Sequence, residues 1–407
     1  MRKSEGAVIH MSKNDLIYYV GQENIEQKAL PVYDDLVLAF LNDLSKELRN
    51  DSEARRYPDI MTFAFWCRKA NLVRLKEQYT DTIGRIGKGI VFHIAPSNVP
   101  VNFAFSLAFG LLAGNGNVVR VSEKQFEQVS IICRNLNNLL QKSEYKVLQK
   151  QNQVVSYPHD SQWNDHYSQI CDMRVIWGGD RTIQELRKSP LKCRATEITF
   201  ADRYSFAVFD ENQISRLEDA ELRNLAEQFY NDTYLMDQNA CSSPHWIFWK
   251  SEKGGSGGRN RFWQALGDLV KQKYDLAEKK VMDKYTMLCE MAASHPDWKL
   301  SRQTDNVLYV VSVRDISKDL EQIRGKFGLF YETEWTGWQA LSRVLSDRTQ
   351  TCVTYGIDRQ ALLQEMIRSG RPGIDRIIPV GKAMDIGVYW DGYDIIGTLS
   401  RKIMIEE

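Results

Sequence analysis

The chain has 407 residues, more than one hydrophobic core usually holds, so we expect two or three lobes. Its 53 basic and 53 acidic residues balance, which argues against a general binder of nucleic acid or membrane surfaces. The seven cysteines include no Cys-x-x-Cys pair, so neither a disulfide framework nor a metal site is indicated. The N-terminus lacks an apolar signal segment, and the longest apolar run, 103–113, is too short to span a bilayer. We therefore expect a cytoplasmic protein without a membrane span.

Apolar residues at helical spacing predict helices over residues 31–79. From residue 84 the pattern changes, and predicted strands alternate with helices. The strands are expected at 90–94, 117–121, 152–157, 173–177, 196–200 and 204–209, and the helices at 102–113, 125–142 and 181–188. Gly114 is a plausible helix C-terminal glycine. This alternation predicts an α/β fold with a mostly parallel sheet.

A helix expected over 217–234 leads to the stretch DQNACSSPHWIFW, which places Cys241 at a turn before a strand. The Gly-rich segment 251–260 lacks the Gly-Lys-Ser/Thr ending of a phosphate-binding loop, so we predict a surface loop there. A long helical stretch over 260–293 and a strand over 308–313 follow.

Cys241 is the first candidate for chemistry. A thiol reacts as the thiolate, which is favoured where helix ends or polar donors lower the pKa, and a turn can also aim a backbone N–H at a reacting oxygen. By its position alone, Cys241 is equally compatible with an inert buried cysteine. His245 lies four residues later, but on a strand it is expected to point along the sheet, so it is a weak candidate for a base.

A second candidate site follows two predicted strands. Asn98 lies in a Pro-flanked turn after the strand 90–94, where an amide makes a good oxyanion donor. Arg120, Ser122 and Glu123 end the next strand, where a nucleotide lies in an open α/β sheet. A simple turn cap and a surface ion pair are the alternative interpretations.

Taken together, these segments resemble the aldehyde dehydrogenase superfamily. AGNGNVVRVSE, IAPSNVP, IWGGD and QNACSSP match four of its motifs in the right order, and QNACSSP is most similar to the luminescence-type fatty-acyl-CoA reductases. The C-terminal segments RTQTCVTYG and GIDRIIPVGKAMDIGVYWDGYDIIGTLSR also resemble that family, so the resemblance runs from about residue 60 to the end.

The resemblance implies a role for each matching residue. Cys241 would be the nucleophile and Asn98 an oxyanion donor beside the Cys241 N–H. The cofactor-binding residues would be Pro96, Arg120, Ser122, Glu123, Gly178 and Gly179. Arg120 stands where the family has lysine and suits the 2′-phosphate of NADPH, whereas the carboxylate of Glu123 prefers the free 2′-hydroxyl of NADH. We expect NADPH, with NADH as the alternative.

Two positions depart from the superfamily pattern. Hydrolytic aldehyde dehydrogenases carry a glutamate where this chain has Thr199, although Glu197 lies two residues earlier on the same strand face and is a possible base. Without that base, hydrolysis of the acyl-enzyme is disfavoured. Its acyl group then exchanges with another thiol, which fits a thioester reductase. Trp390 precedes Asp391-Gly392, at a position where the resemblance implies a histidine.

We therefore predict an NAD(P)H-dependent acyl-CoA reductase that forms aldehyde through an S-acyl cysteine. An aldehyde oxidiser, a reductase of another acyl donor and a non-catalytic scaffold are the alternatives. The expected division is an N-terminal helical extension (1–80), a cofactor domain (81–210), a catalytic domain (211–375) and a C-terminal segment that returns to the cofactor and oligomerisation region (376–407). The resemblance further implies a homo-oligomer and an acyl-activating synthetase partner.

Overall fold

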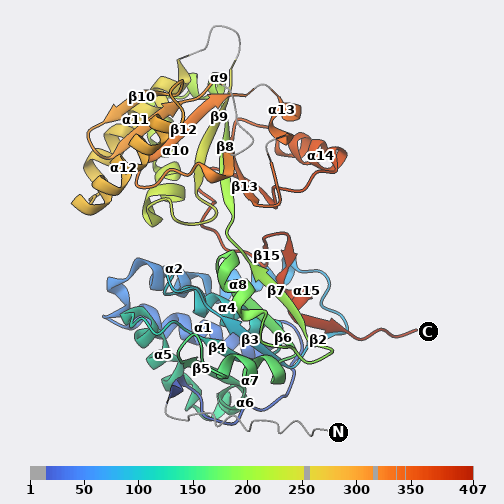
Figure 1. Ribbon diagram of the computed structural model, residues 1–407. Coiled ribbons are helices and arrows are strands. Elements are labelled where there is room, and N and C mark those ends of the chain that lie inside the picture. Colours follow the sequence, from blue (N-terminus) through green and yellow to red (C-terminus); the bar gives the residue numbers. More distant parts are fainter. Residues whose placement is uncertain (1–14, 252–256, 315–319, 336, 344, 407) are drawn as a thin grey trace, which may run out of the picture. The chain divides into compact units, whose positions relative to one another are not determined.

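The structure is a computed structural model that describes residues 15–251, 257–314, 320–335, 337–343 and 345–406. Its fold is α/β, in two compact units (Figure 1). Unit 1 comprises residues 1–201 and 393–407, and unit 2 comprises residues 202–392. The boundaries between the units fall at 201/202 and 392/393. The division into functional segments at 80/81, 210/211 and 375/376 stays a prediction. Residues 1–14, and residues 252–256 of the glycine-rich segment 251–260, lie outside the described part.

Unit 1 contains a six-stranded sheet in the order β1-β5-β4-β3-β6-β7. Only the edge strand β1 pairs antiparallel to its neighbour, and the other pairings are parallel. The strands are β1 (Ile17–Val20), β3 (Ile90–Ile94), β4 (Gly116–Arg120), β5 (Asn152–Ser156), β6 (Met173–Trp177) and β7 (Thr196–Phe200). All of them except β1 were predicted. A separate antiparallel pair joins β2 (Arg85–Gly87) to β17 (Ser400–Lys402).

Helices cover both faces of this sheet. They are α1 (Asp35–Asn50), α2 (Pro58–Trp66), α3 (Lys69–Gln78), α4 (Asn102–Leu112), α5 (Glu127–Leu140), α6 (Lys146–Gln151), α7 (Trp163–Ile170), α8 (Asp180–Leu186) and α15 (Ile395–Leu399). Side chains of α7 and α8 pack with Phe92, Ile176 and their neighbours on one face. Helix α4 is apolar all round and buried, and it is followed by Gly114 in the left-handed conformation (φ 83°), as predicted.

Unit 2 contains a seven-stranded sheet in the order β10-β11-β12-β9-β8-β13-β14. Its strands are β8 (Tyr204–Asp210), β9 (Pro244–Lys250), β10 (Lys299–Thr304), β11 (Leu308–Ser312), β12 (Leu329–Glu334), β13 (Thr349–Tyr355) and β14 (Arg376–Pro379). Only β10 is antiparallel to its neighbour. A short strand β15 (Tyr389–Trp390) precedes the boundary, and β16 (Tyr393–Asp394) follows it.

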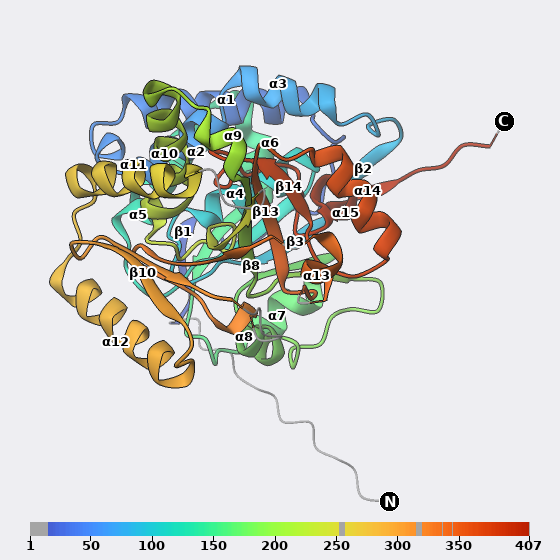
Figure 2. The same cartoon turned by 90° about the horizontal axis from the view of Figure 1, so that it is seen from above.

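Alternate residues of these strands point to opposite faces of the sheet. One face packs against α9 (Glu211–Ser215), α10 (Asp219–Thr233) and α11 (Gly258–Lys273). The other packs against α12 (Glu278–Ser294), α13 (Trp338–Ser342) and α14 (Arg359–Ser369). Figure 2 shows α11 and α12 on opposite sides of β10. The helical stretch predicted over 260–293 is therefore two helices that cover different faces.

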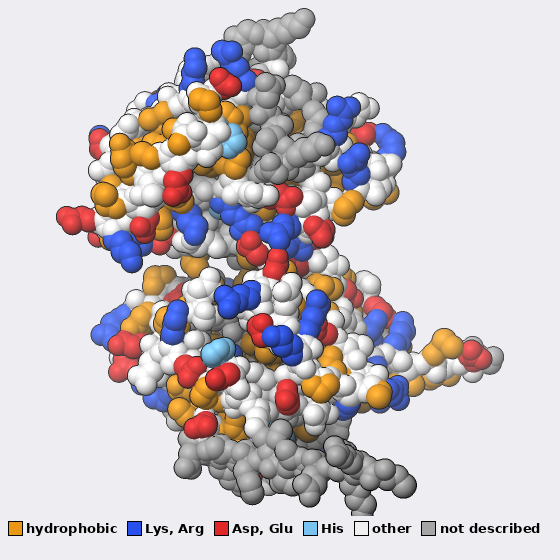
Figure 3. All heavy atoms as spheres, viewed as in Figure 1, with side chains coloured by type: hydrophobic (Ala, Val, Ile, Leu, Met, Phe, Trp, Pro, Cys, Tyr) orange, Lys and Arg blue, Asp and Glu red, His pale blue; other side chains and the backbone are white. Residues whose placement is uncertain are grey.

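Charged side chains of both signs are intermixed on the face shown in Figure 3, in keeping with the balanced composition. Among the described residues, no helix is both long and apolar enough to cross a membrane.

Candidate active site

Cys241 lies in a turn at the amino end of β9, directly before the strand begins. The turn follows the short helix η4 (Tyr234–Met236) and starts with Asp237 and Gln238, whose φ angles of 53° and 57° are left-handed. Non-glycine residues adopt this conformation at a cost of about 1–3 kcal/mol each and need surrounding contacts to hold it. Two such residues in succession indicate that surrounding contacts hold the nucleophile turn, residues 237–243, in this conformation.

The side chain of Gln238 supplies part of that support. It is almost fully buried, and its Oε1 accepts a hydrogen bond from Gly328 N at 2.8 Å. Its Nε2 donates to the carbonyls of Leu329 (3.2 Å) and Pro244 (3.4 Å). Gln238 thus joins the nucleophile turn to the starts of β9 and β12.

Two serines fix the peptide groups on either side of Cys241. The Ser205 hydroxyl donates to the Cys241 carbonyl at 2.6 Å, and Ser243 N donates to the Ala240 carbonyl at 2.9 Å. Because a trans peptide is planar, the Cys241 N–H points away from the bonded Ala240 oxygen. This N–H also lowers the pKa of the Cys241 thiol, so it lies on the side of the sulfur. The turn therefore presents a sulfur and a donor together, as an oxyanion site requires.

The electrostatics of Cys241 differ from the sequence-based expectation of a lowered pKa. The residue is exposed by surface area, yet loss of hydration on its protein-facing side raises the pKa of the thiol to about 11. The carboxylates of Asp391 and Asp202 raise it further, against a smaller opposing effect of Arg324. Solvent on the exposed side screens part of this effect, and the upward direction follows from burial and the two carboxylates. The resting nucleophile is therefore a thiol at neutral pH.

His245 belongs to the core. It is buried on β9, and its Nδ1 lies 2.8 Å from the Gly325 carbonyl, which fixes that nitrogen as the donor. Its ring stacks on Tyr204. Burial lowers the pKa of His245 to about 3, so it is neutral. These contacts favour a structural role over that of a base.

In unit 1 the predicted cofactor residues gather at one edge of the sheet. Pro96 and Asn98 follow β3, Arg120 ends β4, and Gly178 and Gly179 follow β6. The strands β4, β3 and β6 are adjacent and parallel, so their carboxyl ends meet at that edge. The chain order reverses between β3 and β6, which is the switch point where ligands bind in open α/β sheets. Asn98 lies in unit 1 and Cys241 in unit 2, so their meeting stays a prediction.

Arg120 is held in place at this edge. Its Nη2 donates to the Tyr157 carbonyl at 3.1 Å, and its guanidinium lies over the Tyr157 ring at 4.9 Å. Its Nε is buried without a hydrogen-bond partner. Ser122 accepts a bond from Lys124 N at 3.2 Å, and Glu123 is exposed. The three side chains offer a cation, a hydroxyl and a carboxylate along one strand end.

Gly178 and Gly179 lead into α8, whose N-cap is Gly179. A Cβ at Gly179 would meet nothing within 4 Å, so open space lies beside the backbone there. A Cβ at Gly178 would lie 3.2 Å from Thr182.

A buried network supports this edge from below. Asn117 donates through Nδ2 to Asn115 O and Asn152 Oδ1, so its Oδ1 accepts from His93 Nε2 at 3.0 Å. His93 Nδ1 is then the acceptor for the Ser106 hydroxyl at 2.7 Å, whose oxygen accepts from Trp177 Nε1 at 2.9 Å. Burial lowers the pKa of His93 to about 4, which keeps this neutral tautomer. The network links β3, β4 and α4 to the residue before Gly178.

Glu197 lies on β7 between two guanidinium groups. It accepts from Arg174 Nε at 2.7 Å and from Arg187 Nε at 2.8 Å. Arg174 is itself buried and bonded to the carbonyls of Leu186 and Ser189. Both carboxylate oxygens of Glu197 are therefore occupied by guanidinium groups, so the contacts favour a structural role for this residue.

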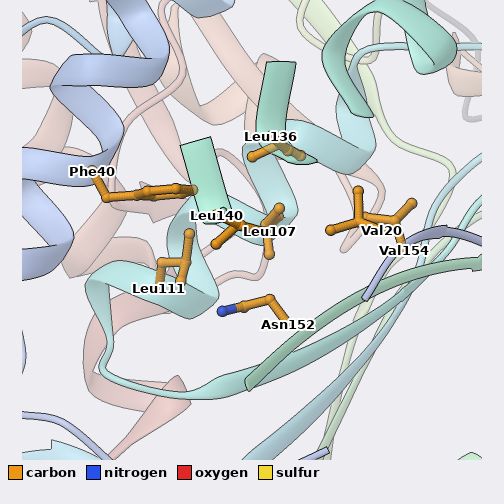
Figure 4. A pocket seen from close by; sticks show the side chains of 8 residues that line it. All are labelled: Val20, Phe40, Leu107, Leu111, Leu136, Leu140, Asn152 and Val154. Carbon is orange, nitrogen blue, oxygen red and sulfur yellow. The ribbon is translucent and has the colours of Figure 1, made fainter. Parts of the chain in front are cut away.

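Figure 4 shows a cavity in unit 1. It has a volume of about 10 Å³, at the lower limit for one water molecule, which indicates a packing gap. Its lining is Val20, Phe40, Leu107, Leu111, Leu136, Leu140, Asn152 and Val154. In the described ranges, no group of three or more His, Cys, Asp or Glu residues is arranged to hold a metal ion.

Sequence reasoning missed the residues that support the cysteine turn. Gln238 lies in the sequence motif around Cys241, but the motif assigned it no role. Ser205, Gln350 and Asp391 lie on other segments, and no local pattern connects them to Cys241. The Asp391-Gly392 pair was the sequence signal for a turn at this point, because aspartate and glycine favour turns with a positive φ. In the structure both residues adopt a positive φ, 50° and 75°.

Solved structures share this fold. Lactaldehyde dehydrogenase from Escherichia coli matches with a TM-score of 0.61 and 12% identity, over 92% of this chain and 87% of that one. An NAD-dependent benzaldehyde dehydrogenase from Corynebacterium glutamicum matches with a TM-score of 0.60 and 14% identity, over 91% and 84%. Glyceraldehyde-3-phosphate dehydrogenase GapN from Methanocaldococcus jannaschii, complexed with NADP, has a TM-score of 0.59 and 13% identity, over 91% and 89%. The class is therefore that of the aldehyde-dehydrogenase fold.

Within that class, residues 68–402 match the family described as Acyl-CoA reductase (LuxC). The match covers most of the chain, so the chain belongs to this family and is an oxidoreductase that acts on acyl groups. Among curated protein sequences, none matches this chain.

Proposed function

We propose that this enzyme reduces an acyl-CoA, or another carrier thioester, to an aldehyde through an S-acyl intermediate on Cys241. The observation that carries the proposal is the nucleophile turn, in which pinned peptide groups present the Cys241 sulfur and N–H together. Family membership supplies the acyl substrate class.

In the first half-reaction Cys241 loses its proton, and its sulfur bonds to the acyl carbon. The Cys241 N–H and Asn98 would stabilise the oxyanion, and one such donor is worth roughly 10²–10³ in rate. Collapse of the oxyanion breaks the bond to the carrier sulfur, which leaves as thiolate and takes up a proton. Because burial and two carboxylates raise the pKa of the Cys241 thiol, the reactive thiolate is a minority form of the resting enzyme at neutral pH.

The second half-reaction needs a reductant. A nicotinamide cofactor, when bound, would supply the two electrons and the hydrogen that convert the acyl group to an aldehyde. The bond between the acyl carbon and the Cys241 sulfur would break in this step, and the released thiolate would take up a proton. The residues that would hold it are Pro96, Arg120, Ser122, Glu123, Gly178 and Gly179. The edge fits such a group, because Arg120 Nε is buried without a partner and open space lies beside Gly179. We propose NADPH over NADH because a guanidinium suits the 2′-phosphate.

The aldehyde-oxidising alternative would need Glu197 as the base for hydrolysis. Two guanidinium groups hold that carboxylate, so we do not favour it. From the resemblance we further propose a cytoplasmic homo-oligomer that receives acyl groups from a synthetase partner.

The test is to incubate the enzyme with acyl-CoAs of increasing chain length, without cofactor, and to measure the added mass on the peptide that contains Cys241. Acylation discharged to aldehyde on adding NADPH would support the proposal. Cys241→Ser should abolish it, whereas Cys193→Ser and Cys289→Ser should not, although those cysteines are also exposed. Failure with every thioester, together with acylation by an acyl phosphate, would identify a different donor. Failure with both donors while cofactor still binds would leave a scaffold as the better interpretation.

A further inference from the structure

Ser205 occupies an irregular position in the centre of the unit 2 sheet. Its strand β8 pairs with β9 on one side and β13 on the other, and the register of both pairings shifts at Ser205. The extra residues are His245 on β9 and Gln350 on β13. Bulges of this kind often re-aim side chains near functional sites.

The Ser205 hydroxyl forms hydrogen bonds to two neighbouring segments at this point. It donates to the Cys241 carbonyl at 2.6 Å and accepts from Thr351 N at 3.2 Å. Ser205 is fully buried, so water cannot replace it in either bond. Its hydroxyl is therefore the direct link between β13 and the nucleophile turn.

The bulged Gln350 extends this link to Asp391. Its Oε1 accepts from Thr351 Oγ1 at 3.2 Å, and its Nε2 donates to Asp391 Oδ1. Both Gln350 and Thr351 are fully buried. A continuous chain of bonds thus runs from Asp391 through Gln350, Thr351 and Ser205 to the Cys241 carbonyl.

The backbone conformation and the burial of Asp391 are both energetically unfavourable. Its backbone is left-handed (φ 50°) and its carboxylate is buried, with the Arg203 guanidinium 4.0 Å from Oδ2. Arg203 also pairs with Asp375, and Arg376 acts on Asp391 from β14. Burial raises the pKa of Asp391 to about 6. Asp391 thus combines a strained backbone with a buried carboxylate, and hydrogen bonds connect it to the turn of Cys241. This combination points to a role beyond packing.

We propose that Asp391 and Ser205 are positioning residues for Cys241, acting through the hydrogen-bond chain of Gln350 and Thr351. The proposal rests on Cys241 being the nucleophile of the proposed function. Ser205 holds the carbonyl of Cys241 and so the direction of its sulfur. Asp391 orients Gln350 and places a negative charge near the thiol, where Asp202 and Arg324 are the other charged groups that act on it.

The test uses the full-length enzyme with Ser205→Ala, Ser205→Thr and Asp391→Asn. Glu332→Gln is the matched control, because Glu332 is a buried carboxylate of the same sheet bonded instead to Trp249, Trp263 and two serines. Two rates are measured at Cys241 by peptide mass: alkylation by iodoacetamide as a function of pH, and acylation by an acyl-CoA that acylates the wild type. Alkylation needs neither substrate nor cofactor recognition.

Ser205→Ala should acylate ~10- to 100-fold more slowly, because a misplaced nucleophile loses near-attack geometry, and Ser205→Thr should restore the rate. Asp391→Asn keeps an acceptor for Gln350 but loses the charge, so its alkylation profile should move to lower pH. Glu332→Gln should change neither. The proposal would be overturned if Ser205→Ala were acylated at the rate of the wild type, or if the pH dependence of alkylation were unchanged in Asp391→Asn. If no acyl thioester acylates wild-type Cys241, the proposed function fails, and the alkylation profile of Asp391→Asn still decides whether Asp391 acts on the thiol.

Discussion

Gln238 Oε1 accepts a 2.8 Å hydrogen bond from the backbone N–H of Gly328, which ties the left-handed start of the nucleophile turn to the beginning of β12. Gln238→Ala would remove the hydrogen bond to this N–H and one hydrogen bond to the Leu329 carbonyl. We expect the free energy of unfolding to fall by about 1–3 kcal/mol and Cys241 acylation to slow. Urea unfolding and single-turnover acylation measure the two effects.

Asn239→Ala is the matched control, because Asn239 is exposed and its side chain donates two long bonds of 3.3 Å, to Met236 O and Asp237 O. Equal stability losses in the two variants would show that Gln238 has no special part in the turn.

Gly179→Ala tests the cofactor edge. The φ of Gly179 is −70° and its Cβ would meet nothing within 4 Å, so alanine should leave the melting temperature unchanged. If the cofactor occupies the open space, the methyl group should weaken NADPH binding, by ~10-fold for a loss of about 1.4 kcal/mol. Fluorescence titration gives the Kd.

Gly387→Ala serves as a control in unit 2, because its Cβ would make only contacts of 3.9 and 4.0 Å. An unchanged NADPH Kd in Gly179→Ala would place the cofactor elsewhere.

Arg120 and Glu123 should act in opposite directions on cofactor choice. Arg120→Gln removes a charge-assisted donor and should weaken NADPH binding by ~10- to 100-fold, but NADH binding by less. Glu123→Gln removes a carboxylate that repels the 2′-phosphate and should tighten NADPH binding several-fold. Calorimetric titration of both variants with both cofactors measures this. Equal losses for NADPH and NADH in Arg120→Gln would exclude a 2′-phosphate contact.

Stability should depend on pH through Asp391. Burial raises its pKa from 3.8 to about 6, so the folded state holds the proton between those values. The stability that this proton contributes is present below pH 3.8 and is lost as the pH rises through 6. Asp391→Asn cannot lose a proton. The free energy of unfolding of the variant, relative to wild type, should therefore rise by up to about 3 kcal/mol from about pH 4 to pH 7.

Asp202→Asn is the control for this prediction, because that carboxylate is about half exposed (46%) and paired with Arg324 at the surface. A difference between Asp391→Asn and wild type that stays constant across this pH range would contradict the raised pKa.

Local patterns in the sequence predicted every strand of the unit 1 sheet except β1, and they predicted β8, β9 and β11 of the unit 2 sheet. The strands β12, β13 and β14 were not predicted from the sequence. The mostly apolar run Ile90–Ile94 is buried throughout and is a central parallel strand, and Gly114 ends α4 because it adopts a positive φ. The same patterns predicted that Asn98, Arg120 and Gly178 follow neighbouring strands, since parallel strands bring their carboxyl ends to one edge. The strand β10 was missed because its residues KLSRQT are polar and mostly exposed, without an apolar face.

Only the tertiary structure decided the environment of Cys241. Its position at a turn was visible in the sequence, but the direction of its pKa shift depends on burial and on Asp391 and Asp202, which lie far away along the chain. The chain of bonds from Asp391 to Ser205 likewise joins separate segments through two register shifts, and no local pattern specifies a register shift. The sequence by itself therefore determined the fold class, the family resemblance and the candidate nucleophile. The packing of distant segments decided what holds that nucleophile and raises the pKa of its thiol, because desolvation and charge depend on distance in space.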